Sequence, residues 1–372
     1  MLLAAAVLMA ACTSDGTGSG PAPGADPPGR PTAGASAESA EGFPPQPEGV
    51  PYPTEEWPEG PWPNEVDRST IDEAIEEAFN DGGEPRVRAV VVVHGGEIVY
   101  ERYSPSPQDG PSTVMPSFSM AKGITSALVG ILVRQGRLDV DDPAAVPAWE
   151  GEDDLRADIT IEHLLHMSSG LEWVQGSEVR DSDLVRAVTS GDAAGYVASR
   201  ELVNEPGTTF SYSDGNSILL DRIMADAIGS PTDFRPFMDE QLFDKLGMAP
   251  VHLEFDEAGT WLGGYAADTT ARNFAKLGLL YLRDGVWEGE RILPEGWVEY
   301  TRTPSTTNPI YGAHWWLDPE RPEVFYAVGV DGQVITVDPE HDLTFVHLAT
   351  DGGSDLALPV AEAILDAFAA AP

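Results

Sequence analysis

The chain has 372 residues, 42% of them hydrophobic, which is enough for one large domain or two modest ones with a sizeable core. Its 21 Lys and Arg residues stand against 62 Asp and Glu residues and leave a net charge of −41. This balance argues against a nucleic-acid-binding protein, because phosphate recognition needs clustered basic side chains. An acidic, well-solvated surface is the simplest interpretation, and a preference for cationic substrates is the alternative.

The chain opens with a short apolar run that ends at its single cysteine, Cys12. Residues 2–11 are too few to span a bilayer as a helix and are typical of a signal peptide. The segment from Leu8 to Cys12 resembles a bacterial lipobox, in which the cysteine is diacylated, although Met9 stands where Leu is commonest. No basic residue precedes the run, so the true start codon is open to question. We expect a signal peptide over 1–11, a lipid anchor on Cys12 and a position on the outer face of the cell membrane; an ordinary signal peptide is the alternative.

A long stretch rich in Gly, Pro, Ala and Ser follows the cysteine and fades near residue 63. Such a composition cannot bury enough apolar surface to form a core. We therefore expect a disordered tether over 12–63 and a single folded domain over 64–372. With one cysteine, this domain contains neither an internal disulfide nor a cysteine-based metal site.

Within the folded region, the first elements expected are a helix over 67–79 and a β-hairpin over 87–103. The helix is predicted from apolar residues at helical spacing. The hairpin is predicted from two strand-like runs on either side of His94-Gly95-Gly96. A second helix is expected over 119–135, ending at Gly136.

The rest of the chain is mostly helical in pattern, from about 140 to 320, and then returns to strands near 324–328, 333–337 and 343–348 before a closing helix over 357–369. Strands at both ends with helices between them predict an α+β fold. In it, the N- and C-terminal strands form one antiparallel sheet flanked by helices, and a mainly helical lobe is inserted in the middle.

Ser119 and Lys122 are the first candidates for chemistry. At helical spacing they lie on one face, within reach of a hydrogen bond. A serine hydroxyl needs a neighbouring base, and Lys serves as one when burial or a positive field lowers its pKa towards neutrality. Lys122 is one of only three lysines, in a chain that otherwise uses Arg, and it stands among apolar residues. The alternative is a lysine that snorkels at a helix surface.

Two later segments add candidates. Residues 205–216 contain a Pro-Gly turn, then Tyr212 in a short aromatic stretch, and then the start of a helix near Asn216. Residues 329–334 place glycines at the entry to an apolar strand, where a backbone can pass close to a ligand. Taken alone, Tyr212 is a packed aromatic and the glycines are a turn.

Together, in this order and spacing, the three features resemble the serine β-lactamase and penicillin-binding superfamily. The branch they are most similar to contains class C β-lactamase-like esterases and 6-aminohexanoate-dimer hydrolases. The resemblance extends through residues 161–171, 271–297 and 331–339 and covers most of the folded region.

This resemblance implies that Ser119 is the acylated nucleophile, Lys122 its base and Tyr212 a proton relay to the leaving group. It further implies an oxyanion hole formed by the amides of Ser119 and Gln333. Substrate contacts are expected from the site's neighbours, namely Asp214, Gly332, Trp173 and Trp315.

Two positions depart from the family pattern. Where many relatives have Tyr-x-Asn, this chain has Tyr212-Ser213-Asp214, which replaces an amide donor with a carboxyl group. Where β-lactamases and peptidases have Lys-Thr-Gly, it has Val330-Asp331-Gly332, which lacks the cation that grips a substrate carboxylate. Esters or short amides without a carboxylate beside the scissile bond therefore fit better than β-lactams or D-alanyl peptides.

The expected function is that of a serine hydrolase that cleaves a small ester or amide through an acyl-enzyme, with no cofactor, metal or nucleic acid involved. The alternatives are a surface-tethered binding or sensor protein that has lost turnover, and a D-alanyl peptidase or β-lactamase. Trp173, Trp315 and Trp316 either line the pocket or pack in the core. His163 and His166 could pair on a metal but lack a third ligand, which favours a structural role.

Overall fold

The computed structural model describes residues 43–47, 49–80, 86–151, 153–176, 182–350 and 353–371. Residues 1–11, Cys12 and most of the expected tether lie outside this range, so the signal peptide and the lipid anchor stay predictions. Within the described ranges, no helix combines the length and the apolar character needed to cross a membrane.

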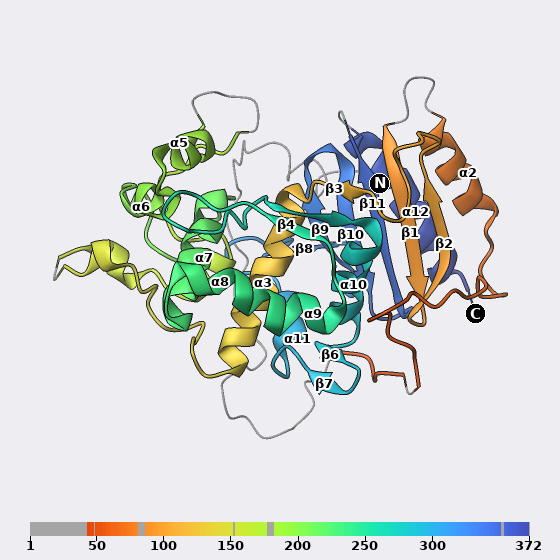
Figure 1. Ribbon diagram of the computed structural model, residues 1–372, viewed down its shortest axis with the longest axis horizontal. Helices are drawn as coiled ribbons and strands as arrows, with labels where there is room; N and C mark the ends of the chain where they lie inside the picture. Colours follow the sequence, from red (N-terminus) through yellow and green to blue (C-terminus); the bar gives the residue numbers. More distant parts are fainter. Residues whose placement is uncertain are drawn as a thin grey trace.

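The centre of the fold is a six-stranded antiparallel sheet in the order β2-β1-β11-β10-β9-β8 (Figure 1). The N-terminal hairpin supplies β1 (Val87–His94) and β2 (Glu97–Tyr103), and the C-terminal part of the chain supplies the other four strands. These are β8 (Trp316–Leu317), β9 (Phe325–Gly329), β10 (Gln333–Asp338) and β11 (Leu343–Ala349). The predicted sheet built from both ends of the domain is confirmed.

Each face of the sheet packs against its own pair of helices. Because side chains alternate along a strand, Val90 and Val92 of β1 belong to one apolar cluster, and Ala89, Val91 and Val93 belong to the other. The first cluster packs on α2 (Ser69–Phe79) and α12 (Ser354–Ala369), and the second on α3 (Ala121–Arg134) and α10 (Ala271–Leu282). Apolar residues on both faces of β1 explain its almost unbroken run of valines.

The inserted lobe connects β2 to β8 and is mainly helical, as predicted. Its long helix α7 (Asp214–Ile228) packs against α3 and brings the two halves of the site together. The remaining helices are short: α4 (Ile161–Leu165), α5 (Asp183–Ser190), α6 (Ala193–Ala198), α8 (Pro231–Met238), α9 (Asp244–Leu246) and α11 (Trp297–Thr301). Five small strands complete it: β3 (Val114–Met115), β4 (Val251–Leu253), β5 (Ala267–Thr270), β6 (Val286–Trp287) and β7 (Glu290–Arg291).

The folded region begins before Asn64, earlier than predicted. Residues 58–60 run beside the free edge of β2, where Gly60 donates to the Ile98 carbonyl at 3.0 Å and the Ile98 amide donates to the Pro58 carbonyl at 2.9 Å. Further upstream, the indole of Trp287 donates to the Thr54 hydroxyl at 2.7 Å. The unpaired edge of β2 gives this Pro-rich segment hydrogen-bond partners that its composition does not reveal.

Candidate active site

Ser119 lies in a single 3-10 turn, Phe118–Met120, which leads directly into α3. The turn is strained at Phe118, whose φ of +44° lies in the left-handed region and costs about 1–3 kcal/mol. Ser117 anchors it, because its hydroxyl donates to the Tyr265 carbonyl at 3.0 Å and accepts from the Ala267 amide at 2.9 Å. The strain is therefore held in place by neighbours, and it leaves Ser119 half-buried at the start of a fully buried helix.

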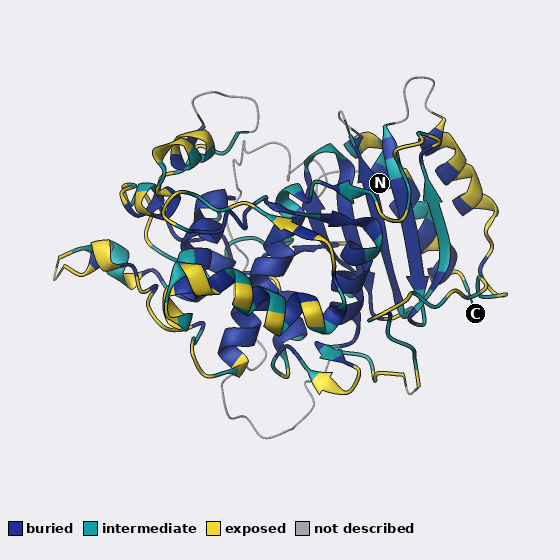
Figure 2. Cartoon of the chain, in the orientation of Figure 1, coloured by how far each residue is buried: buried dark blue, intermediate teal, exposed yellow. Residues whose placement is uncertain are grey.

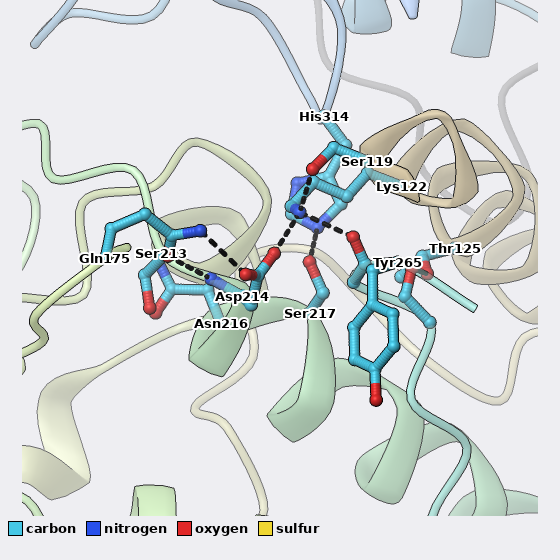
Figure 3. A network of polar contacts seen from close by, with 12 residues as sticks. Ser119, Lys122, Thr125, Gln175, Ser213, Asp214, Asn216, Ser217, Tyr265 and His314 are labelled. Carbon is cyan, nitrogen blue, oxygen red and sulfur yellow. Dashed lines mark hydrogen bonds and ion pairs between the residues drawn. The ribbon is translucent and has the colours of Figure 1, made fainter. Parts of the chain in front are cut away.

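Lys122 lies one turn further along α3 and is only 1% exposed. Its amine donates to the Ser119 hydroxyl at 3.3 Å, to the Gly264 carbonyl at 2.7 Å and to a carboxylate oxygen of Asp214. Figure 3 shows these groups converging on the amine. The predicted contact between Ser119 and Lys122 is present, and all three N–H bonds of an ammonium group have an acceptor.

Asp214 begins α7 and is 2% exposed. One carboxylate oxygen pairs with Lys122, and the other accepts from the Gln175 amide at 2.7 Å. Gln175 also accepts from the backbone N–H of Asp214 at 3.2 Å and from the indole of Trp173 at 2.7 Å. The prediction that Asp214 binds substrate is therefore corrected, because its carboxylate is already held inside the protein by Lys122 and Gln175.

The charge state of Lys122 also differs from the prediction. Burial lowers the pKa of Lys122, but the adjacent Asp214 carboxylate and Tyr212 outweigh it, so that the pKa is raised above its ordinary value. The apolar neighbours of Lys122 in the sequence predicted a lowered pKa, because Asp214 reaches the amine from a segment 92 residues away. In the free protein Lys122 is an ammonium group.

Tyr212 faces the same amine, with the Lys122 nitrogen 4.8 Å from the centroid of its ring. The ring is 8% exposed and stacks on Trp316 at 5.6 Å. Burial raises the pKa of Tyr212; Lys122 opposes this rise and Asp214 adds to it. The phenol therefore keeps its proton at neutral pH and is available as a hydrogen-bond donor beside Ser119.

The predicted oxyanion-hole amide of Gln333 is already used elsewhere. Its N–H donates to the Val330 carbonyl inside the turn that precedes β10, and its side chain donates to the Ala349 carbonyl at 2.7 Å. The strand end that reaches the Ser119 turn is Gly329, where a Cβ would lie 2.8 Å from the Ser117 carbonyl oxygen. Gly329 thus packs against the turn that carries Ser119, and the oxyanion role of Gln333 stays a prediction.

The other predicted contacts divide between the site and the core. Trp173 lies at the site, where its ring packs against Gly215 beside Asp214. Trp315 is fully buried against Tyr281, at 4.5 Å between ring centroids, and cannot contact a ligand. Gly332 packs against the Gly353 carbonyl at the start of α12, with a φ of +82°. The prediction for Trp315 is therefore wrong, and that for Gly332 stays a prediction.

Two buried side chains, Asp221 and His314, hold the segments around Lys122 in place, and no sequence motif pointed to either of them. Asp221 on α7 accepts from the Gly263 amide at 2.8 Å and so fixes the loop whose next carbonyl, that of Gly264, binds Lys122. His314 donates through Nδ1 to the Leu165 carbonyl at 2.8 Å and accepts from the Ser217 hydroxyl at 2.9 Å. Burial lowers the pKa of His314 to about 3, so its ring is neutral.

Comparison with known proteins agrees with this geometry. The β-lactamase family matches residues 72–369, which is most of the chain. The chain belongs to the β-lactamase family. It is 23% identical over 304 residues to the 6-aminohexanoate-dimer hydrolase of Paenarthrobacter ureafaciens, covering 75% of each protein.

Solved structures show the same β-lactamase fold. A Bacillus anthracis protein described provisionally as a 6-aminohexanoate-dimer hydrolase superposes with a TM-score of 0.69 at 22% identity, covering 85% of this chain and 87% of the other. A family VIII carboxylesterase superposes with a TM-score of 0.65 at 15% identity, covering 83% and 99%. The expected fold is confirmed, and hydrolysis is the activity common to the names of these relatives.

In this member of the β-lactamase family, the two histidines considered as metal ligands, His163 and His166, have structural roles. His163 accepts from the Thr160 amide through Nδ1 at 3.2 Å, while its own amide donates to the Thr160 hydroxyl at 3.2 Å, so the two residues cap α4. His166 packs on Tyr300 at 5.4 Å between ring centroids. Across the described ranges, no three His, Cys, Asp or Glu side chains are grouped as a metal site.

Proposed function

We propose that this protein is a serine hydrolase that cleaves an ester or a short amide through an acyl-enzyme on Ser119. The observation that carries the proposal is the 3.3 Å contact between the Ser119 hydroxyl and the buried Lys122 amine, with Tyr212 against the same amine. A hydroxyl at the end of a strained turn, with a titratable amine beside it, has the geometry of an activated nucleophile.

In the first step, the Ser119 oxygen attacks the substrate carbonyl carbon and its proton passes to the neutral form of Lys122. The amides of Ser119 and Gln333 hold the carbonyl oxygen as it gains negative charge. The leaving group then departs with that proton, which returns from Lys122 by way of Tyr212. Water completes the reaction by attacking the acyl-enzyme carbonyl, with the same groups moving the proton in reverse.

Substrates without a carboxylate beside the scissile bond suit this site. Val330 and Asp331 occupy the segment where a lysine would attract such a carboxylate, and Asp331 repels it. Similarity to proteins named 6-aminohexanoate-dimer hydrolase and family VIII carboxylesterase supports the amide and the ester class, respectively.

A second candidate is a binding or sensor protein that keeps the fold without turnover. The saturation of Lys122 by three acceptors favours it, because an ammonium group cannot take the Ser119 proton. The two candidates differ only in whether an acyl-enzyme forms on Ser119 and breaks down.

The test is a panel of p-nitrophenyl esters, linear amides and a chromogenic cephalosporin, assayed with the wild type and Ser119→Ala. We expect ester or amide turnover that falls at least about a thousandfold in Ser119→Ala, and weak or no cephalosporin hydrolysis. A fluorophosphonate probe should label Ser119, while Ser112→Ala, at an exposed serine nearby, keeps full labelling. Turnover that survives Ser119→Ala would refute the mechanism, and ligand binding without any turnover would favour the second candidate.

We also propose that the domain is held outside the cell by a lipid on Cys12, downstream of a cleaved signal peptide. The lipobox-like segment and the Gly- and Pro-rich stretch after it support this position. Radiolabelled palmitate should be incorporated into the wild type expressed in a bacterial host and not into Cys12→Ala. Equal labelling of the two proteins would exclude the anchor.

A further inference from the structure

The protein contains two buried lysines, and only one of them has a carboxylate beside it. Lys276 on α10 is 5% exposed and donates to the Gly247 carbonyl at 2.6 Å and the Thr54 carbonyl at 3.5 Å. Burial alone lowers the pKa of Lys276 to about 8. Lys122 is buried more deeply and also binds a backbone carbonyl, yet its pKa moves in the opposite direction. The larger of the two added influences at Lys122 is the carboxylate of Asp214, and the second is Tyr212.

The carboxylate of Asp214 is held in a fixed position next to the Lys122 amine. Its side chain is 3% exposed, so little solvent screens the pair. The bond from Gln175 to its second oxygen at 2.7 Å, and the bond from its own amide to Gln175 at 3.2 Å, fix the carboxylate from the side opposite Lys122. A carboxylate held in this way favours the ammonium form of the lysine over the free amine.

The other titratable groups around Lys122 do not supply a competing negative charge. Burial raises the pKa of Asp221 well above its ordinary value, although its hydrogen bonds and Lys122 oppose the rise, so the neutral form of this carboxyl group is favoured. Burial likewise raises the pKa values of Tyr212, Tyr265 and Tyr311, which keep their protons, and His314 is neutral. Asp214 is therefore the one carboxylate among the titratable groups that face this amine in the described structure.

We infer that Asp214 is a positioning residue that locks Lys122 as an ammonium group in the free enzyme, so that Ser119 is activated only under alkaline conditions. The inference rests on the proposed function. It also holds if Tyr212 is the group that takes the Ser119 proton, because Asp214 disfavours the phenolate as well. Attack by Ser119 in either case requires the base to lose its proton to solvent first, and that proton is lost more readily as pH rises.

The experiment compares pH profiles of kcat/KM for a p-nitrophenyl ester between about pH 6 and 10.5, with Ser119→Ala as the background at each pH. The wild type should still be gaining activity at about pH 9. In Asp214→Asn the midpoint of this rise should move down by about 1–3 pH units, because burial then acts on Lys122 without a counter-charge. At pH 7 this variant should be about tenfold more active than the wild type, in spite of its weaker base.

Asp221→Asn is the matched control. Asp221 lies on the same helix and is fully buried, and because its raised pKa favours the neutral form, Asn is the closest match to its shape and charge. The midpoint in Asp221→Asn should coincide with that of the wild type. Coinciding midpoints for the wild type and Asp214→Asn would overturn the inference while leaving the proposed function intact. Turnover independent of Ser119 at every pH would overturn the proposed function itself.

A direct titration keeps the test decisive if Asp214→Asn does not fold. The chain has three lysines, Lys122, Lys245 and Lys276, so selective ¹³C labelling gives three side-chain signals. The Lys276 signal should titrate first, near pH 8, and the Lys122 signal should stay that of an ammonium group beyond pH 10. A Lys122 signal that titrates with or before Lys276 would refute the inference.

Discussion

The two buried layers on either side of the sheet differ in composition: one is apolar, and the other encloses an ion pair. The layer under α2 and α12 is built from apolar side chains such as Val90, Phe345 and Ile364, whereas the interior between α3 and α7 encloses the Lys122–Asp214 ion pair. Figure 2 shows the strands of the sheet and α3 mostly in the dark blue of buried residues. Burial alone therefore does not mark a functional site. The buried ion pair is the better guide, because enclosed charges are costly unless their position serves a purpose beyond packing.

Breaking the ion pair should have the largest effect. Lys122→Met removes the base and leaves the Asp214 carboxylate buried without a counter-charge. We expect at least a thousandfold loss of kcat/KM and about 3–5 kcal/mol lower free energy of unfolding. Urea denaturation and ester hydrolysis measure the two effects. The control is Lys245→Met, at a surface lysine paired with the exposed Glu290, where less than about 1 kcal/mol is expected.

A substitution in the apolar layer should lower the stability of the protein and leave its activity unchanged. Ile364 on α12 is fully buried, and Ile364→Ala leaves a cavity that costs about 2–5 kcal/mol. Below its melting temperature the variant should keep wild-type kcat/KM, since α12 packs on the face of the sheet away from Lys122. A tenfold loss of kcat/KM in protein shown by circular dichroism to be folded would show that this layer is coupled to the site.

Much of this comparison could be predicted from local sequence patterns. The valine run of β1 and the apolar strands near the C-terminus indicated one sheet built from both ends of the chain. The spacing of Ser119 and Lys122 placed them on one helix face, because that geometry depends only on three consecutive peptide units.

The features that could not be predicted depend on contacts between segments that are far apart in the sequence. The residue type of Asp214 was visible, but its approach to Lys122 across 92 residues of chain was not, and the predicted direction of the Lys122 pKa was wrong for that reason. Gln175 lies in a loop without any motif. The Val330–Gly332 turn, with Asp331 at φ +61°, was not foreseen either, and within it the Gln333 amide donates to the Val330 carbonyl.

A smaller effect is expected on the pH dependence of the free energy of unfolding, to which each layer contributes one buried histidine. Burial lowers the pKa of His347, on the α12 side, to about 4, and that of His314, beside the site, to about 3. Below about pH 6.5 the unfolded chain binds protons at these positions and the folded protein does not, so the free energy of unfolding falls as pH falls. Each histidine contributes about 1.4 kcal/mol per pH unit until its folded pKa is reached.

His347→Asn isolates the contribution of the apolar layer. Asn can still donate to the Gly332 carbonyl that accepts from His347 Nδ1 at 2.7 Å, but it does not titrate. Between pH 7 and pH 5 this variant should lose about 2 kcal/mol less than the wild type in urea denaturation. An identical loss in the two proteins would mean that His347 is not a buried neutral group.

The smallest effect should come from an ion pair on the same helix as Asp214. Arg222 and Asp226 of α7 pair at 3.0 Å, but their side chains are 35% and 42% exposed. Asp226→Asn should cost about 0.3–0.5 kcal/mol, and this cost should vanish in about 1 M salt, because water and ions screen an exposed pair. The penalty of Lys122→Met should persist in the same salt, since ions cannot enter around Asp214. If both penalties disappear together, the Lys122–Asp214 pair is open to solvent, and the contrast between the two layers would not hold.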